Sequence, residues 1–338
     1  MPIGTTTYTG INPEITGYLS GVLLKRALPL MPFEPWVNVM NTLPANETKK
    51  MSMRRFKLDY DTAIANMYAS EGVVPQAQQL IQEEVSVTLK QIVGLVKITD
   101  VVDDTHTSPV FKEAFVALGE IAPRMIELDR WYTLRAGTNK WYANGAARSA
   151  VNTSVSNTLF KKVVRNLERN VASKITKVAN TSSNFNSESL AAAYIAVGHL
   201  DLRSDIESLT GFTSIKDYPS NVKVFEGEVG SIAAGNIRFV LTDFFAPYPS
   251  AGGAAGAMIT SNGVSADVYT LFIFGANAWE SVSLKGKSAI QVYTVNPNQT
   301  NQSNPLGQFG YAGFKTMQGS LITNDAWCAV IECAATEL

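Results

Sequence analysis

The chain has 338 residues, 46% of them hydrophobic, and a formal net charge of −1 at pH 7. This length can form one large domain or two to three smaller ones, and the balanced charge excludes a global nucleic-acid- or membrane-binding signature. Only 17% of the residues are charged, against about 25% in ordinary soluble domains, so we expect partner subunits to cover much of the surface.

No apolar run approaches the roughly 20 residues of a membrane-spanning helix. The two cysteines, Cys328 and Cys333, have an odd separation that predicts opposite faces of one strand, so we expect no disulfide between them. Residues Met1–Asn12 carry no secretory signal, and the predicted setting is therefore reducing and intracellular.

Residues Met1–Pro44 are rich in proline, which favours extended backbone, apart from a short predicted helix at Tyr18–Leu28. This extended arm carries apolar residues that must pack on something, either on their own domain or on a neighbouring subunit. They are Phe33, Trp36, Val37 and Val39.

A long two-stranded excursion follows the arm. Lys49–Tyr60 alternates in character as a strand does, and Glu84–Lys97 is predicted to return as the second strand. Between them, Glu71-Gly72-Val73-Val74-Pro75 reads as a turn-rich tip. Because an isolated hairpin is only marginally stable in water, we expect this one to lie on a surface.

The longest predicted helix is Ser108–Gly137, where Ser108 can cap the first turn and Gly137 can end the last. Pro123 is expected to kink it. Its predicted apolar face consists of Phe111, Ala114, Phe115, Leu118, Ile121, Ala122, Met125 and Leu128.

A second amphipathic helix is predicted at Thr158–Val178, with an apolar face that includes Val171 and Ile175. Its other face is basic, through Lys161, Lys162, Arg165, Arg169, Lys174 and Lys177. Two interpretations remain open: a solvated helix face, or a contact for nucleic acid or an acidic neighbour.

Glu226–Thr242 is predicted to form a glycine-punctuated hairpin that ends in a β-rich run. We expect a strand or short helix at Ala191–Leu200, a helix at Asp201–Leu209, a loop at Phe245–Asp267, a strand at Val268–Phe274, an irregular segment at Val295–Gln308, and strands at Tyr311–Met317 and Ala326–Cys333.

Residues for catalysis are sparse. The only histidines, His106 and His199, have no partner in the local sequence, and no set of cysteines and histidines has zinc-binding spacing. The Gly286-Lys287-Ser288 triplet lacks the upstream glycine of a phosphate-binding loop, because Ser281 stands at that position. We therefore expect no enzyme activity, no cofactor and no metal.

Several segments, in the same order along the chain, resemble the major capsid proteins of enquatrovirus-like podophages. The most informative is Glu226–Thr242, read as EGEVGSIAAGNIRFVLT. At Tyr194–Leu202, Leu200 stands where the family has proline. The other similar segments are Lys49–Lys57 with Ser70–Pro75, Val87–Thr99, Asp267–Trp279 (DVYTLFIFGANAW) and Pro305–Lys315 (PLGQFGYAGFK).

This resemblance implies an α+β chain with the tailed-phage major capsid fold, known as the Johnson fold. The implied division is an N-terminal arm at 1–48, an extended E-loop hairpin at 49–98, a P-domain at 99–154 with its spine helix at 108–137, an A-domain at 155–266, and strands completing the P-domain at 267–338.

The resemblance also implies a structural protein that self-assembles as pentamers and hexamers of an icosahedral shell around the double-stranded DNA of a tailed bacteriophage. The E-loop tip (Glu71, Gly72, Val73, Val74, Pro75) would contact a neighbouring subunit, and Lys161, Lys162, Arg165 and Arg169 would contact packaged DNA, weakly and without specificity, or a neighbour. Portal, scaffold or decoration proteins are further implied partners. The implied location is the virion capsid, assembled in the host cytoplasm, with no membrane contact. Two alternatives remain: a nanocompartment shell of the same fold with protein cargo, and an enzyme with an unrecognised site.

Overall fold

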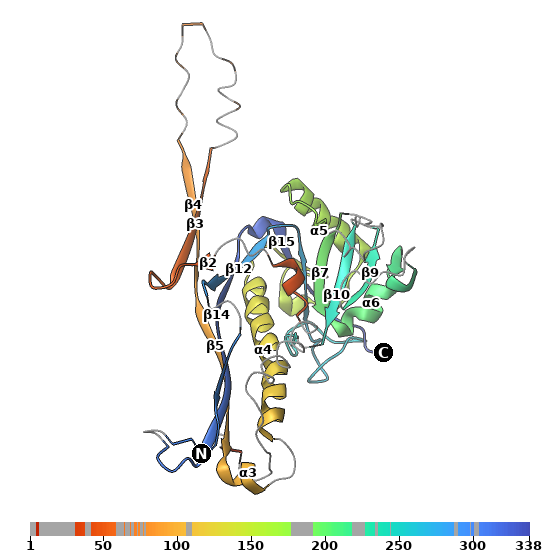
Figure 1. Cartoon of the computed structure of the whole chain (residues 1–338). Coiled ribbons are helices and arrows are strands. Elements are labelled where there is room, and N and C mark those ends of the chain that lie inside the picture. The colour runs from red at the N-terminus through yellow and green to blue at the C-terminus, as the bar shows by residue number, and fades with distance from the viewer. Residues whose placement is uncertain are drawn as a thin grey trace, which may run out of the picture.

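The computed structural model describes residues 5–6, 31–37, 42–58, 64, 68, 71–72, 74, 77, 79–105, 110–176, 192–217, 227–233, 236–243, 245–286, 290–297, 299–300 and 304–338. Within these ranges the chain forms two large sheets and a separate two-stranded hairpin that projects from them (Figure 1). The helix expected at Tyr18–Leu28, the cap expected at Ser108 and the histidine His106 lie outside the described residues.

A six-stranded sheet is organised around its longest strand, β14 (Phe309–Ile322). Its antiparallel neighbour β5 (Lys90–Thr99) is paired with it from Phe309↔Thr99 to Gln318↔Lys90. The sheet is completed by β1 (Thr5–Thr6), β2 (Thr42–Leu43), β12 (Trp279–Leu284) and β13 (Gln291–Val295).

The long helix α4 (Val110–Arg135) covers one face of this sheet (Figure 1), after the short helix α3 (Asp100–Thr105). It runs for 26 residues through Pro123, close to the predicted bounds. Its first half buries Phe111, Phe115 and Leu118 against the sheet. The predicted apolar face was wrong at Ile121, which is 48% exposed, because the buried stripe moves around the helix toward Ile126, Arg130, Trp131 and Leu134.

A seven-stranded sheet forms the second body, with its central strands buried on both faces. In spatial order its strands are β6 (Lys140–Tyr142), β15 (Cys328–Cys333), β11 (Tyr269–Phe274), β7 (Tyr194–His199), β10 (Ile237–Thr242), β9 (Glu228–Ile232) and β8 (Phe212–Ser214). The predicted hairpin at Glu226–Thr242 is confirmed as the antiparallel pair β9–β10.

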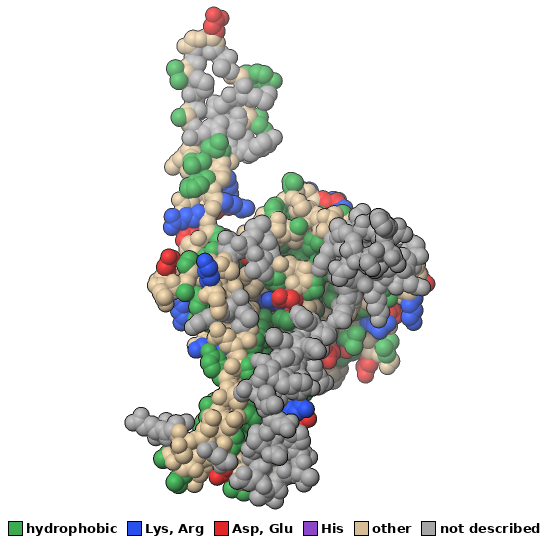
Figure 2. All heavy atoms as spheres, viewed as in Figure 1, with side chains coloured by type: hydrophobic (Ala, Val, Ile, Leu, Met, Phe, Trp, Pro, Cys, Tyr) green, Lys and Arg blue, Asp and Glu red, His purple; other side chains and the backbone are tan. Residues whose placement is uncertain are grey.

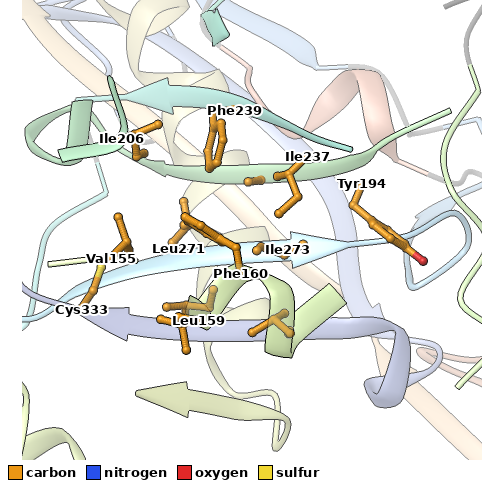
Figure 3. Close-up of a cluster of buried hydrophobic side chains, with 14 of the residues drawn as sticks. Val155, Leu159, Phe160, Tyr194, Ile206, Ile237, Phe239, Leu271, Ile273 and Cys333 are labelled. Atoms are coloured by element: carbon orange, nitrogen blue, oxygen red, sulfur yellow. The ribbon is translucent and has the colours of Figure 1, made fainter. Parts of the chain in front are cut away.

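Each face of the seven-stranded sheet has its own core. Helix α5 (Asn157–Arg169) buries Leu159 and Phe160 against one face, where Phe239 and Cys333 also lie (Figure 3). On the opposite face an aromatic cluster includes Cys328. The two cysteines are both buried and free, and they occupy opposite faces, as their spacing predicted. Burial raises the pKa of the Cys328 thiol to about 12.

Short helical segments connect the strands. Strand β7 confirms the strand interpretation of Ala191–Leu200, and the helix predicted after it is divided into η4 (Leu200–Leu202) and α6 (Arg203–Glu207). The remaining short segments are η2 (Glu34–Trp36), η3 (Arg148–Ala150), η5 (Ile215–Asp217) and η6 (Asp325–Trp327).

Helix α5 ends earlier than predicted, because the backbone turns into the left-handed region at Val171. There the amide of Ala172 donates to the carbonyl of Leu167 (3.0 Å) and the amide of Val171 donates to that of Glu168 (3.0 Å). These two bonds form a Schellman motif, whose left-handed position normally holds glycine. Val171 adopts a φ of +56° there and is 79% exposed, so it belongs to no apolar helix face.

We expect Val171→Gly to stabilise the subunit by about 1 kcal/mol, because a β-branched residue is strained at positive φ and glycine is not. Little packing is lost, since the valine side chain is exposed. Val171→Ala is the matched control; it keeps a Cβ and should gain less. Chemical denaturation measures both variants, and a destabilised glycine variant would contradict this account of the helix end.

Two of the sheets contain strands from more than one of the expected domains. Strands β11 and β15, which were expected to complete the P-domain, lie in the seven-stranded sheet beside strands of the expected A-domain. The single return strand predicted at Glu84–Lys97 is two strands, β4 (Ile81–Thr88) and β5, and only β4 belongs to the projecting hairpin. These pairings join segments far apart in sequence, which local patterns cannot specify.

Candidate intersubunit surface

The projecting hairpin consists of β3 (Lys50–Lys57) and β4, paired along their full length from Lys50↔Thr88 to Lys57↔Ile81. Figure 1 shows it extending away from both sheets. Among the described residues, β3 and β4 hydrogen-bond in a ladder only with each other. Both outer edges of this ribbon therefore carry backbone groups that another chain can pair with.

The hairpin is anchored at its base and not along its length. Val87 and Leu89 are buried there with Leu43, Val282 and Leu321 of the six-stranded sheet. The partly buried side chains that pack on this cluster include Met51, Met53 and Val85. Beyond these positions every residue of β3 and β4 is exposed except the half-buried Glu83, which pairs with Arg55 and Lys57 of the same hairpin, so the body of the same subunit supports only the base.

Cross-strand ion pairs fix the register of the exposed part of the stem. Arg54 Nε lies 3.1 Å from Glu84 Oε2, and Arg55 Nε lies 2.6 Å from Glu83 Oε2. Lys57 also pairs with Glu83, and its hydrogen bond, followed by that of Arg55, lowers the pKa of the Glu83 carboxyl. Opposite charges face each other across the ribbon, so ion pairs hold the pairing register of the two strands where there is no apolar core.

Apolar side chains are exposed along the outer part of the hairpin, where Figure 2 shows hydrophobic groups spread over its surface. Phe56 is 60% exposed and Val74 is 88% exposed. The others are Leu58, Ile64, Tyr68, Leu80 and Ile81. Single exposed apolar residues are ordinary, but a series along one projecting element is typical of an interaction surface.

The predicted tip lies at the outer end of this hairpin. Glu71, Gly72 and Val74 are exposed, and Gly72 has a φ of +79°, a conformation that suits glycine in a turn. Val73 and Pro75 lie outside the described residues. The structure thus places the described tip residues far from the cores of their own subunit.

The predicted basic face lies on helix α5, away from the tip. Lys161, Lys162, Arg165 and Arg169 are all exposed. Within the part of the chain that the structure describes, no carboxylate lies at ion-pair distance from any of the four. Lys174 lies beyond the end of the helix and pairs with Glu168 at 3.2 Å, and Lys177 is outside the described residues.

Neutralising the four basic residues of α5 together, by glutamine substitution, is expected to leave folding intact and to change assembly or DNA retention modestly. The opposite face of the helix supplies its packing. If these residues contact DNA, counterion release makes retention salt-dependent, and the variant should lose that dependence. If they contact an acidic neighbour, assembly yield should respond to salt and DNA retention should not. If assembly yield and DNA retention are unchanged at every salt concentration, the four residues form only a solvated helix face.

His199, Asp201 and Tyr269 form a hydrogen-bonded group. His199 Nδ1 accepts from the amide of Asp201 (3.1 Å), and Asp201 Oδ2 accepts from the Tyr269 hydroxyl (2.7 Å). Burial and the bond to Asp201 raise the pKa of Tyr269 far above its ordinary value. The described residues contain no cluster of His, Cys, Asp and Glu suited to a metal ion, and none of their helices is long and apolar enough to cross a membrane.

The sequence did not reveal the buried carboxylates, and several of them have partners distant in the chain. Glu332 receives two hydrogen bonds from Arg148 (2.8 and 2.6 Å). Asp205 accepts from the amide and hydroxyl of Thr336. Glu127 accepts from the amide of Phe33.

No family model and no curated protein matches the sequence. Solved structures do match. The capsid of Ralstonia phage GP4 has a TM-score of 0.60 and 11% identity, covering 91% of this chain and 92% of its own. The Cyanophage Pam1 capsid asymmetric unit has a TM-score of 0.59 and 11% identity over 91% and 93%.

A third match is the head structure of Helicobacter pylori bacteriophage KHP40, with a TM-score of 0.60 and 10% identity over 90% of each chain. At such low identities the likeness shows the fold. The projecting hairpin and the long helix on a sheet correspond to the E-loop and the spine helix that the sequence resemblance implies. The chain therefore has the α+β fold of tailed-phage capsid proteins, the Johnson fold.

Proposed function

We propose that the chain is a major capsid protein that self-assembles into an icosahedral shell enclosing the double-stranded DNA of a tailed bacteriophage. The observation that carries this proposal is the β3–β4 hairpin. It projects from the body, exposes both edges and displays a series of apolar side chains that its own subunit does not cover. Such a surface suits a second copy of the chain, because a repeated contact between unlike surfaces can close into a ring.

In this proposal the hairpin lies across a neighbouring subunit and buries its apolar residues and backbone edges there. Repetition of the contact forms rings of five and six subunits. The tip residues, from Glu71 to Pro75, are the outermost part of this contact. The low fraction of charged residues fits a subunit with interfaces on several sides.

We assign the parts of the subunit from the sheets. Residues 1–48 form the arm. The E-loop comprises β3, β4 and the residues between them. The P-domain is the six-stranded sheet with α4 as its spine helix, and the A-domain is the seven-stranded sheet with α5 and α6. This assignment moves β6, β11 and β15 into the A-domain and β5 into the P-domain.

The partners proposed beyond the shell itself follow from the same role. The exposed basic residues of α5 suit weak, non-specific contact with DNA phosphates or with an acidic neighbour. Portal, scaffold and decoration proteins belong to this role as well. The subunit would assemble in the host cytoplasm and reside in the virion. We further propose, from the similar segments, that the chain is related to the major capsid proteins of enquatrovirus-like podophages.

Electron microscopy of the purified protein tests the shell, and nuclease treatment of the particles tests the cargo. We expect closed particles of uniform size that protect DNA from nuclease. Closed particles filled with protein would favour a nanocompartment of the same fold. Discrete small oligomers under all assembly conditions would contradict the shell and leave open an enzyme.

A further inference from the structure

A short N-terminal segment, Phe33–Trp36, is inserted between the two sheets of the subunit, where Figure 1 shows its red-orange helical turn beside α4. The Phe33 side chain is fully buried. Its ring centroid lies 6.1 Å from that of Phe272 in the seven-stranded sheet and 5.8 Å from that of Trp279 in the six-stranded sheet. It also lies 5.2 Å from that of Phe245. One side chain therefore contacts both bodies.

A buried ionic group fastens the same segment to α4. The amide of Phe33 donates to Glu127 Oε2 (2.8 Å), and Arg130 Nη1 donates to Glu127 Oε1 (2.6 Å). Arg130 also pairs with Glu34 Oε2 at 2.5 Å. Glu127 is fully buried and Arg130 is 4% exposed. Hence the segment both covers the Glu127 carboxylate and uses it as an acceptor.

The charges in this group do not balance. Two carboxylates, Glu127 and Glu34, share one guanidinium, and Glu127 has no contact with water. Burial raises the pKa of Glu127 to about 7; Arg130 and the hydrogen bond from the Phe33 amide oppose this rise, and Glu34 adds to it. Three other ionisable groups lie on the elements packed around Glu127. Asp129 of α4 pairs with Lys90, and β12 contributes the buried Glu280. Cys328 of β15 is a neutral thiol near neutral pH, because burial raises its pKa to about 12.

We propose that Phe33–Trp36 is a latch that locks the two sheets together, and that protonation of Glu127 strengthens its docking. When the segment leaves, Glu127 Oε2 meets water, which favours the carboxylate, and loses the Phe33 amide, which opposes that effect. Because burial is the largest cause of the raised pKa, the gain of water dominates. When the segment is docked, the neutral acid is favoured, and its carbonyl oxygen still accepts from the Phe33 amide. The aromatic contacts of Phe33 hold the segment at any pH, so protonation adjusts a docking equilibrium that already favours the closed state.

The sign of the pH dependence follows by linkage. The pKa of Glu127 is about 7 in the docked state. We expect undocking to expose the carboxyl to water and to return its pKa toward the ordinary glutamate value, so docking binds a proton. The stabilisation of the latch is complete below the ordinary glutamate pKa and is lost as the pH rises through about 7. Each pH unit between the two pKa values permits up to a tenfold change in the docking equilibrium.

Hydrogen–deuterium exchange of the full-length subunit tests the latch. After correction for intrinsic exchange rates, a peptide covering residues 31–37 should exchange at least about tenfold more slowly at about pH 5.5 than at about pH 8.5. A peptide covering the buried strand β11 serves as the internal reference for global stability. Equal protection of 31–37 at both pH values would overturn the proposal.

Two variants test whether Glu127 is the group whose titration causes the pH dependence. Glu127→Gln keeps the acceptor for Phe33 without a titrating proton, so protection of 31–37 should stay high and lose its pH dependence. Glu34 is 43% exposed and Glu34→Gln should fold readily; by removing one negative charge it should shift the midpoint of the pH dependence downward. An unshifted midpoint in Glu34→Gln, or a pH dependence that persists in Glu127→Gln, would show that another group causes the pH dependence and would overturn the proposal. These measurements concern the isolated subunit, so their outcome is independent of whether it forms a shell.

Discussion

Replacing Leu118 by aspartate is expected to prevent folding of the subunit. Leu118 is 4% exposed on α4, where it packs with Phe115 of the same helix and with Ile98 and Phe314 of the six-stranded sheet. An unpaired carboxylate at this position costs several kcal/mol, and the lost packing adds to that. The total is comparable with the whole stability of a typical domain, about 5–15 kcal/mol.

Ile121→Asp is the matched control, one turn away on the same helix. Its side chain is 48% exposed, so the aspartate remains in water and the isolated subunit should fold. Circular dichroism and thermal melting of the two soluble fractions provide the measurement. A Leu118→Asp protein that is soluble and melts cooperatively would show that this face of α4 is not part of a core.

Deleting Ala69–Gln79 is expected to leave a folded subunit that assembles poorly. The described residues of this segment are exposed, and the body of the subunit supports only the base of the hairpin. Removing an exposed tip therefore costs the subunit little stability. If the tip crosses a neighbour in the shell, its loss removes an intersubunit contact from every copy at once.

Sedimentation should show a large loss of particles with an unchanged melting temperature of the subunit. Val74→Asp is a smaller version of the same test, since it adds a charge to a valine that is 88% exposed and leaves the ribbon intact. Normal particle yield in the deletion variant would mean that the hairpin tip has no role in assembly.

Helices and strands that depend on a local sequence pattern could be predicted from the sequence. The alternating residues of β3, the apolar run of β11 and the glycine-punctuated hairpin β9–β10 were each predicted close to their observed bounds. Helix α5 was predicted too long, because its end depends on Val171 adopting a conformation that valine seldom adopts. The short strands β6 and β8 were missed, since three residues in a strand carry too little pattern.

The division into sheets could not be predicted, because it depends on pairing between distant segments. Strand β11 pairs with β15 and β7 on its two sides, and no periodicity in any of the three specifies this choice. The same limit applies to the candidate site. The tip and the basic face of α5 were located from sequence, whereas the Glu127–Arg130–Glu34 group joins the arm to a helix far along the chain.

A reconstruction of the assembled particle by electron cryomicroscopy tests the central claim most directly. The account predicts a closed icosahedral shell of five- and six-membered rings in which each β3–β4 hairpin lies across a neighbouring subunit, with Phe56 and Val74 covered by that neighbour. A hairpin folded back on its own subunit, or one that projects into solvent with its apolar residues uncovered, would contradict it.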